Sequence, residues 1–153
     1  MRDYLECQAY VGHLRREHKR IHESLVVVER ELQDSDSPSE GNGIRAGLTR
    51  LRETLVGHFE QEEQGGCLEE AVCCDPRLSG EVSEIGKQHP RILHLLDRLL
   101  KRADDCRTVD YRESFRQFAK VVHAHEAAEN RILHTAFGTG QFEPNDSPSA
   151  LGE

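Results

Sequence analysis

Six residues of two metal-binding types occupy positions where the hydrophobic pattern of this 153-residue chain predicts an apolar side chain. They are His18, His58, Glu62, His89, His125 and Glu129. Imidazole nitrogens and carboxylate oxygens are common ligands of transition-metal ions. Burying such groups without a partner would be strongly unfavourable. We therefore expect the six side chains to meet in the interior of the fold, around metal ions that satisfy them.

Four stretches of the chain carry these residues, and each has the periodicity of an amphipathic helix. They span residues 11–32, 44–62, 78–103 and 111–136. Apolar residues recur in them at steps of three and four, which keeps one face of a helix turned toward a core. The first face, for example, consists of Val11, Leu14, His18, Ile21, Leu25, Val28 and Leu32.

Turn-forming residues separate the four stretches and define the expected organisation. Ser, Gly, Asp and Pro are concentrated in residues 34–43, a glycine pair stands at 65–66, and a polar turn covers 104–110. A short segment after the glycine pair is expected to add a further helical turn. We predict an all-α fold, an up-down-up-down four-helix bundle over residues 1–137, and a flexible C-terminal tail over 138–153.

The six residues repeat one layout in the two halves of the chain. A lone histidine, His18 or His89, is followed at nearly the same interval by a pair, His58-x-x-x-Glu62 or His125-x-x-x-Glu129. Residues four apart lie one turn apart on the same helix face, so both members of a pair can reach a common cavity. Two such pairs can provide terminal imidazoles and bridging carboxylates to two metal ions. Mixed nitrogen and oxygen ligation suits iron or manganese.

This pattern resembles the hemerythrin-like, or HHE cation-binding, domain family, from about Tyr4 to Phe137. The resemblance rests on His18, on His58-Phe59 followed by Glu62-Glu63, on His89, and on His125 followed by Glu129. It implies a four-helix bundle with a non-haem centre of two iron ions, bridged by carboxylates and by a solvent-derived oxo or hydroxo group. By the same resemblance, Glu62 and Glu129 are the bridges and the four histidines are terminal ligands.

The third stretch departs from the family pattern. O2 carriers of the family generally have a His-x-x-x-His pair there, whereas Leu93 stands four residues after His89, and His94 is turned by about a hundred degrees from the required face. A missing imidazole leaves an open position, which favours peroxide or other small-ligand chemistry over reversible O2 carriage. Pro90 is expected either to bend this helix or to interrupt it. His22 is left with three interpretations: a surface histidine, an outer partner of a ligand, or the fifth imidazole.

Other polar residues near the six receive weaker roles. Glu63 and Glu126 are expected to face solvent, although Glu63 is also placed to hydrogen-bond a ligand histidine. His13, His123 and His134 are assigned no role. The cysteines are Cys7, Cys67, Cys73, Cys74 and Cys106, an odd number without CxxC spacing, which argues against a disulfide framework. A redox or additional metal role for Cys67, Cys73 and Cys74 stays open.

Charge and hydropathy restrict the partners. The formal net charge of -8 disfavours nucleic acid and anionic membranes as binding partners. The N-terminus lacks the apolar run of a signal peptide, and we expect a cytoplasmic protein.

Two functional hypotheses follow. The first is a di-iron protein that binds O2, peroxide or a related small diatomic ligand for sensing, storage or detoxification, with peroxidase- or catalase-like activity left open. The alternative is a metal-stabilised regulatory or interaction module without turnover, acting through a protein partner. A mineral iron store is disfavoured because a single bundle offers no cavity for mineral. A purely structural reading requires the histidines and glutamates to satisfy only one another.

Overall fold

Helices form almost all of the part of the chain that the computed structural model describes, which is residues 4–34, 41–64 and 66–137. The four long helices are α1 (Tyr4–Gln33), α2 (Asn42–Glu63), α4 (Ser79–Lys101) and α5 (Val109–Phe137). A short helix, α3 (Cys67–Cys74), follows α2, and two 3-10 turns, Pro76–Leu78 and Ala103–Asp105, flank α4. No strand occurs in these described ranges, so the all-α prediction is confirmed for them. The predicted tail, 138–153, lies outside the described residues.

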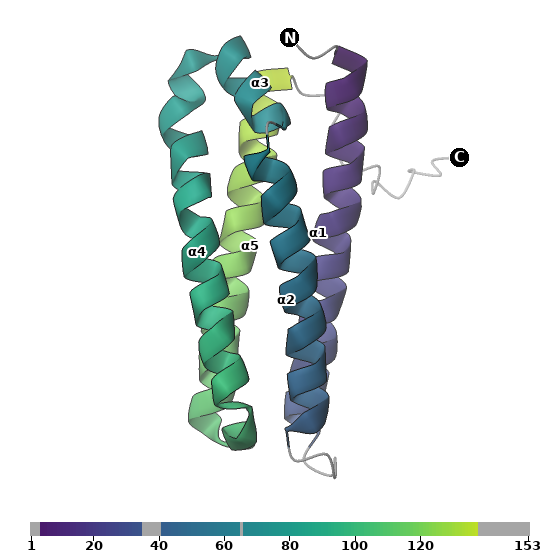
Figure 1. Ribbon diagram of the computed structural model, residues 1–153, viewed down its shortest axis with the longest axis vertical. Coiled ribbons are helices and arrows are strands. Elements are labelled where there is room, and N and C mark those ends of the chain that lie inside the picture. The colour runs from purple at the N-terminus through teal and green to yellow at the C-terminus, as the bar shows by residue number, and fades with distance from the viewer. Residues whose placement is uncertain (1–3, 35–40, 65, 138–153) are drawn as a thin grey trace, which may run out of the picture.

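The four long helices lie side by side and reverse direction from each one to the next along the chain (Figure 1). The helix α1 contacts α2 and α5, and α4 contacts the same two helices. This arrangement is compatible with the up-down-up-down bundle that the turn signals predict. The predicted extra turn after the glycine pair is the helix α3, which packs against α5.

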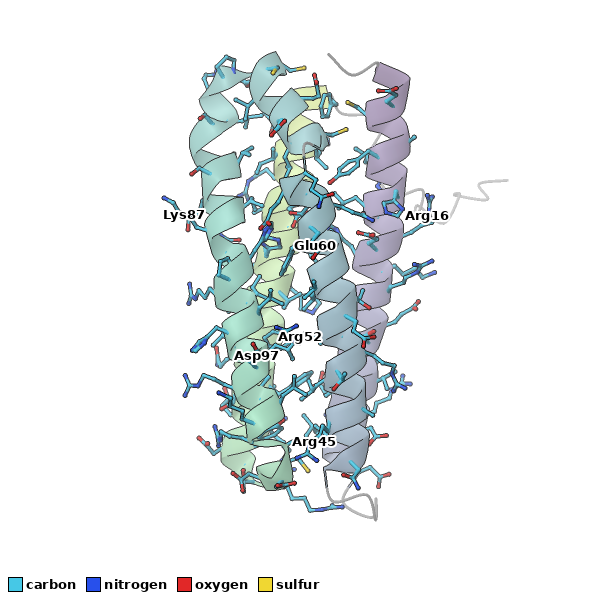
Figure 2. The ribbon with its side chains drawn as sticks, viewed as in Figure 1. Arg16, Arg45, Arg52, Glu60, Lys87 and Asp97 are labelled. Atoms are coloured by element: carbon cyan, nitrogen blue, oxygen red, sulfur yellow. The ribbon has the colours of Figure 1, made fainter. Side chains whose placement is uncertain are left out.

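Charged side chains cover the outside of the four helices. Arg16, Glu60 and Lys87 are exposed on α1, α2 and α4 (Figure 2). Between α2 and α4, Nε of Arg52 donates a hydrogen bond of 2.7 Å to Oδ1 of Asp97. This ion pair joins two helices that both contribute to the predicted site, although an exposed pair of this kind adds little stability. None of the helices in the described part of the chain is long and apolar enough to cross a lipid bilayer.

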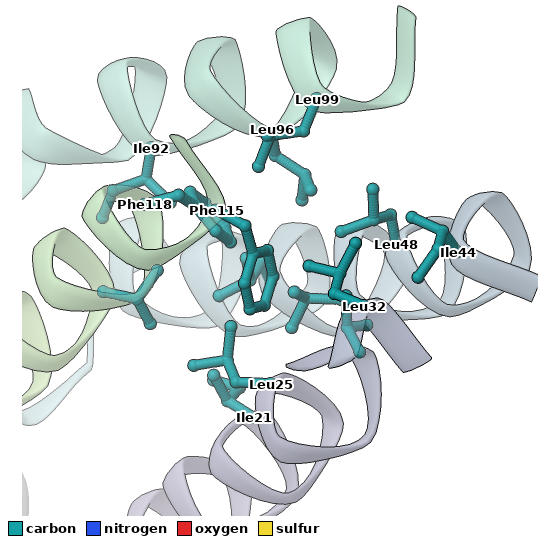
Figure 3. Packing of buried hydrophobic residues seen from close by; sticks show 14 of the residues in the cluster. Ile21, Leu25, Leu32, Ile44, Leu48, Ile92, Leu96, Leu99, Phe115 and Phe118 are labelled. Carbon is teal, nitrogen blue, oxygen red and sulfur yellow. The ribbon is translucent and has the colours of Figure 1, made fainter. Parts of the chain in front are cut away.

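Buried apolar side chains form two separate clusters. The larger cluster contains residues from α1, α2, α4 and α5, including Leu25, Leu48, Leu96 and Phe118 (Figure 3). The smaller cluster lies toward α3 and contains Cys7, Val11, Leu14, Cys67, Leu68, Ala71, Leu78, Ile85, Ile132 and Leu133. On each long helix the predicted metal ligands fall between members of the two clusters or at their border. The six ligands thus form a central polar layer between two apolar halves of the core.

The predicted helix faces are confirmed almost residue by residue. Along the apolar faces every predicted core position is buried except Val82 and Ala136, which are partly buried. Pro90 lies inside α4, which continues through it, so the alternative of an interrupted helix is wrong. A proline has no N–H to donate to the preceding turn, but Pro90 is exposed, where that position costs least.

Candidate metal centre

The central polar layer brings together all six residues that the sequence singles out. Their relative exposures range from 0% for Glu129 to 8% for His18, so each of the six is buried. His18 comes from α1, the pair of His58 and Glu62 from α2, His89 from α4, and the pair of His125 and Glu129 from α5. All four long helices therefore contribute to one site.

Each glutamate of the layer contacts imidazoles from more than one helix. Glu62 contacts Nε2 of His58 through Oε1, and its Oε2 lies 3.0 Å from Nε2 of His89. Glu129 contacts Nε2 of His125 through Oε1. Its Oε2 lies 3.4 Å from Nε2 of His18 and 3.5 Å from Nε2 of His58. The two carboxylates thus occupy the middle of the layer, with the histidines around them.

Four of these residues are close enough to share a cation. One ligand atom each from His58, Glu62, His125 and Glu129 lies within 4.8 Å of the others, and all four residues are buried. The remaining two histidines extend this group on opposite sides. The ring centres of His18 and His58 are 5.2 Å apart, and those of His89 and His125 are 5.1 Å apart. This donor set of imidazole nitrogen and carboxylate oxygen could hold a metal ion.

Several of the inward-facing atoms have no hydrogen-bond partner, although they are buried. They are Nε2 of His18, His58 and His125, Oε1 of Glu62, and both carboxylate oxygens of Glu129. Buried polar atoms in folded proteins are nearly always satisfied, because an unsatisfied one is costly. A cation at the centre of the layer would satisfy this set of acceptors together. The donor set therefore fits a metal.

The opposite ring nitrogens of three histidines are held by hydrogen bonds. Nδ1 of His58 lies 2.5 Å from Oε2 of Glu17, and Nδ1 of His89 lies 2.8 Å from Oε1 of Glu63. Nδ1 of His125 lies 2.7 Å from Oε1 of Gln88. Because these oxygens accept, each Nδ1 carries the hydrogen. Hydrogen bonds of this kind fix the ring and leave Nε2 to bind metal.

These outer partners follow one pattern that the sequence analysis missed. Glu17 on α1 is next to His18 but bonds to His58 on α2, and Gln88 on α4 is next to His89 but bonds to His125 on α5. Each partner is thus the sequence neighbour of one ligand and the hydrogen-bond partner of another ligand on the next helix. Polar residues adjacent to the ligands were the available signal, and only Glu63 was interpreted in that way.

Glu126 on α5 corrects the sequence analysis, which expected it to face solvent. It is buried, with 9% relative exposure, and its Oε1 has no hydrogen-bond partner. Burial raises the pKa of Glu126 to about 7, while the nearby His18 acts in the opposite direction. Like the outer partners, Glu126 is the sequence neighbour of one predicted ligand, His125, and it interacts electrostatically with another, His18, although no hydrogen bond joins them. The helical periodicity placed Glu126 beside the apolar face, and the packing of α1 against α5 covers it.

The pKa values of His58 and Glu129 indicate that the central polar layer favours bound positive charge. Burial opposes the charged form of His58, but the neighbouring carboxylates of Glu129 and Glu62 raise its pKa to about 11. Burial also opposes ionisation of Glu129, yet the imidazoles of His125, His18 and His58 around it hold its pKa well below the usual value. The layer therefore keeps the carboxylate of Glu129 charged and binds a proton on His58. A metal cation would compete with this proton for the same atom.

Two aromatic residues border the layer. The ring of Phe59 stacks on His89 at 4.1 Å between centres, with 10° between the planes, and meets His125 edge-on at 5.4 Å. It thereby restricts both rings. Tyr10 has a buried hydroxyl without a hydrogen-bond partner, and a Cβ added at Gly66 would come within 3.1 Å of it. Burial, and then the charges of Glu62 and Glu129, raise the pKa of Tyr10, whose place near the layer the sequence did not indicate.

The remaining histidines and cysteines lie outside the layer. His94 is exposed, as its position off the helix face predicts, and Leu93 packs against the larger apolar cluster. His22 is exposed and its ring pairs with that of His123, so it does not supply a fifth imidazole to the layer. None of the five cysteines, which all lie in the described ranges, forms a disulfide.

Comparison of the chain with protein-family models, with curated proteins and with solved structures gave no match. The function of this chain is therefore inferred from the chemistry of the central polar layer.

Proposed function

We propose that this chain is a hemerythrin-like protein whose central polar layer holds two iron ions and binds O2, peroxide or a related small diatomic ligand. One observation carries the proposal. Buried Nε2 and carboxylate atoms from α1, α2 and α5 converge without hydrogen bonds, while the outer nitrogens of two of the same histidines, His58 and His125, are hydrogen-bonded. These atoms contact one another yet form no hydrogen bonds, which is unusual for buried groups that serve only to pair with each other.

The central polar layer has two halves, and we propose that each half binds one of the two ions. His18 and His58 form one imidazole pair, and His89 and His125 form the other, with nearly equal ring separations of 5.2 and 5.1 Å. Glu62 and Glu129 lie between the pairs and are proposed as the bridging carboxylates. Iron bound in this way supplies a Lewis acid and an electron reservoir for a small oxygen-containing ligand.

Reaction with peroxide or a similar ligand is favoured over reversible O2 carriage. The third long helix contributes only His89, because Leu93 packs in the core and His94 is exposed. The resulting ligand set is one imidazole short of the five that the family's carriers generally use. Beside this position Phe59 stacks on the ring of His89, and Glu63 and Gln88 accept hydrogen bonds from the outer nitrogens of His89 and His125.

Metal content and absorption test this proposal. We expect aerobically purified protein to contain two irons per chain, with near-ultraviolet and visible bands that change when peroxide is added. A metal-free protein that stays folded and binds no added Fe²⁺ or Mn²⁺ would overturn the proposal. Catalysed loss of peroxide, compared between iron-loaded and metal-free protein, separates turnover from simple binding.

A regulatory or interaction module is the second candidate. It is favoured because the proposed ligands come from all four long helices. Because the layer draws on all four long helices, metal binding would affect the packing of each of them. This candidate predicts strong stabilisation by iron with no loss of added peroxide. The same two measurements therefore distinguish it from the first candidate.

A further inference from the structure

A second pair of histidines lies across the interface of α1 and α5, outside the central polar layer. The ring centres of His22 on α1 and His123 on α5 are 5.1 Å apart, with 57° between the ring planes. Both side chains are exposed, so a cation in solvent can reach them directly. The sequence analysis gave His123 no role, and the central layer does not include either residue.

The spacing of this outer pair suits a shared metal ion. Two imidazoles bound to one cation through nitrogens about 2.0–2.1 Å away have ring centres roughly 5 Å apart at the usual ligand angles. The two pairs inside the layer have the same separation, 5.2 Å for His18 with His58 and 5.1 Å for His89 with His125. Borderline divalent cations prefer imidazole, and water can fill their remaining positions on an exposed surface.

The outer pair lies directly beside the central layer. His22 stands one helical turn after His18 on α1, and His123 stands one turn before Glu126 on α5. Since α1 and α5 run in opposite directions, both steps lead toward the same end of the bundle (Figure 1). Glu126 and His18 are within electrostatic reach of each other, and Oε1 of Glu126 is buried without a hydrogen-bond partner. A cation leaving the outer pair would thus meet a carboxylate and an imidazole before Glu129.

We propose that His22 and His123 form an outer binding site for a borderline divalent cation, from which the cation passes by Glu126 and His18 into the central polar layer. The delivery role rests on the proposed function of the layer, whereas binding at the outer pair does not. Glu126 is the intermediate carboxylate of this route.

The binding step is tested with Ni²⁺ by titration calorimetry on the full chain. The double variant His22→Asn, His123→Asn should bind one Ni²⁺ fewer per chain than the wild type. His94→Asn, which changes an exposed histidine on α4, is the matched control and should keep the wild-type number. Equal Ni²⁺ binding by the double variant and the wild type would overturn the outer site.

The delivery step is tested by the rate of anaerobic Fe²⁺ uptake into metal-free protein. The double variant should reach the wild-type iron content at saturation, but about ten-fold more slowly, because the cation is no longer concentrated at the entrance. Uptake at the wild-type rate would overturn delivery while leaving the central iron site intact. A wild type that takes up no Fe²⁺ would overturn the proposed function and delivery together, and the Ni²⁺ titration would still decide the outer site.

Discussion

The carboxylate of Glu129 on α5 reaches across the bundle to His58 on α2, where its Oε2 lies 3.5 Å from Nε2 of the imidazole. Both groups are buried, and neither of these two atoms has a hydrogen-bond partner. The two residues are far apart in sequence and stand on helices whose His-x-x-x-Glu pairs have the same spacing. Their meeting at the centre of the layer is the geometry expected of a bridging carboxylate beside a terminal imidazole.

Removing either of these two residues should release metal. We expect His58→Ala and Glu129→Ala each to lower the iron content to less than roughly half of the wild-type value. With metal at about a hundred times its dissociation constant, the loss of one bound ion would cost about 2.7 kcal/mol of stability. Metal analysis and thermal unfolding measure the two effects. His134→Ala, outside the layer, should change neither quantity, and equal effects from all three variants would contradict the site assignment.

Removing an outer hydrogen-bond partner should weaken metal binding without abolishing it. Glu17 holds Nδ1 of His58 at 2.5 Å, so Glu17→Leu should lower metal affinity by about 10- to 100-fold while the metal content at saturation stays unchanged. Competition with a chelator measures the affinity. Glu60→Gln changes an exposed carboxylate on α2 and should have no such effect. An unchanged affinity in Glu17→Leu would show that this hydrogen bond does not support the ligand.

The stability of the metal-free protein should fall as the pH rises above neutrality. Burial opposes protonation of His58, but Glu129 and Glu62 raise its pKa to about 11 in the folded chain. Its stabilising effect is therefore complete below the ordinary histidine pKa of about 6.5 and is lost as the pH rises toward 11. The lowered pKa of Glu129 acts at the acid end, where its contribution is lost as the pH falls through its folded pKa.

Metal should reverse this dependence, because the imidazoles must lose their protons to bind it. We expect the increase in melting temperature on adding metal to grow between about pH 6 and pH 9. Melting curves with metal and with a chelator measure this difference. A metal-free melting temperature that rises over the same interval would contradict the proposed imidazole–carboxylate pairing.

Glu126→Gln should stabilise the metal-free protein at alkaline pH. Burial raises the pKa of Glu126 to about 7, so the folded wild type loses stability as the pH rises from about 4.5 through 7. Glutamine does not ionise, and the variant should be more stable above pH 7 by up to about 3 kcal/mol. The difference should shrink toward about pH 5, where the glutamate is protonated. Denaturant unfolding at both pH values measures it, and a variant that is less stable at alkaline pH would contradict the burial of a charged carboxylate.

Local periodicity was enough to locate the helices and the six residues of the central layer. A side chain on the apolar face of an amphipathic helix is buried wherever that helix packs against a core. His18, His58, Glu62, His89, His125 and Glu129 stand on such faces, and the structure buries all six. The same reasoning placed His94 off the core-facing side of its helix, and His94 is exposed. Whether the six residues bind iron stays a prediction.

Residues one position away from the apolar faces could not be assigned in this way. Glu63 and Glu126 follow a ligand directly, yet Glu63 is exposed and Glu126 is buried. Their surroundings depend on how far each helix is rotated about its axis and on which helix lies beside it. Neither of these can be deduced from local sequence periodicity. The hydrogen bonds of Glu17 to His58 and of Gln88 to His125 depend on the same two quantities.

The sequence by itself therefore determined an all-α chain and six of the seven buried polar residues of the described ranges, because helical spacing assigns each side chain to a face. Only the tertiary structure decided which of those groups meet. It set Glu129 against His58, buried Glu126, and brought the ring centres of His22 and His123 to 5.1 Å. Contacts between helices arise from their relative rotation and register, which are fixed only when all four long helices pack together.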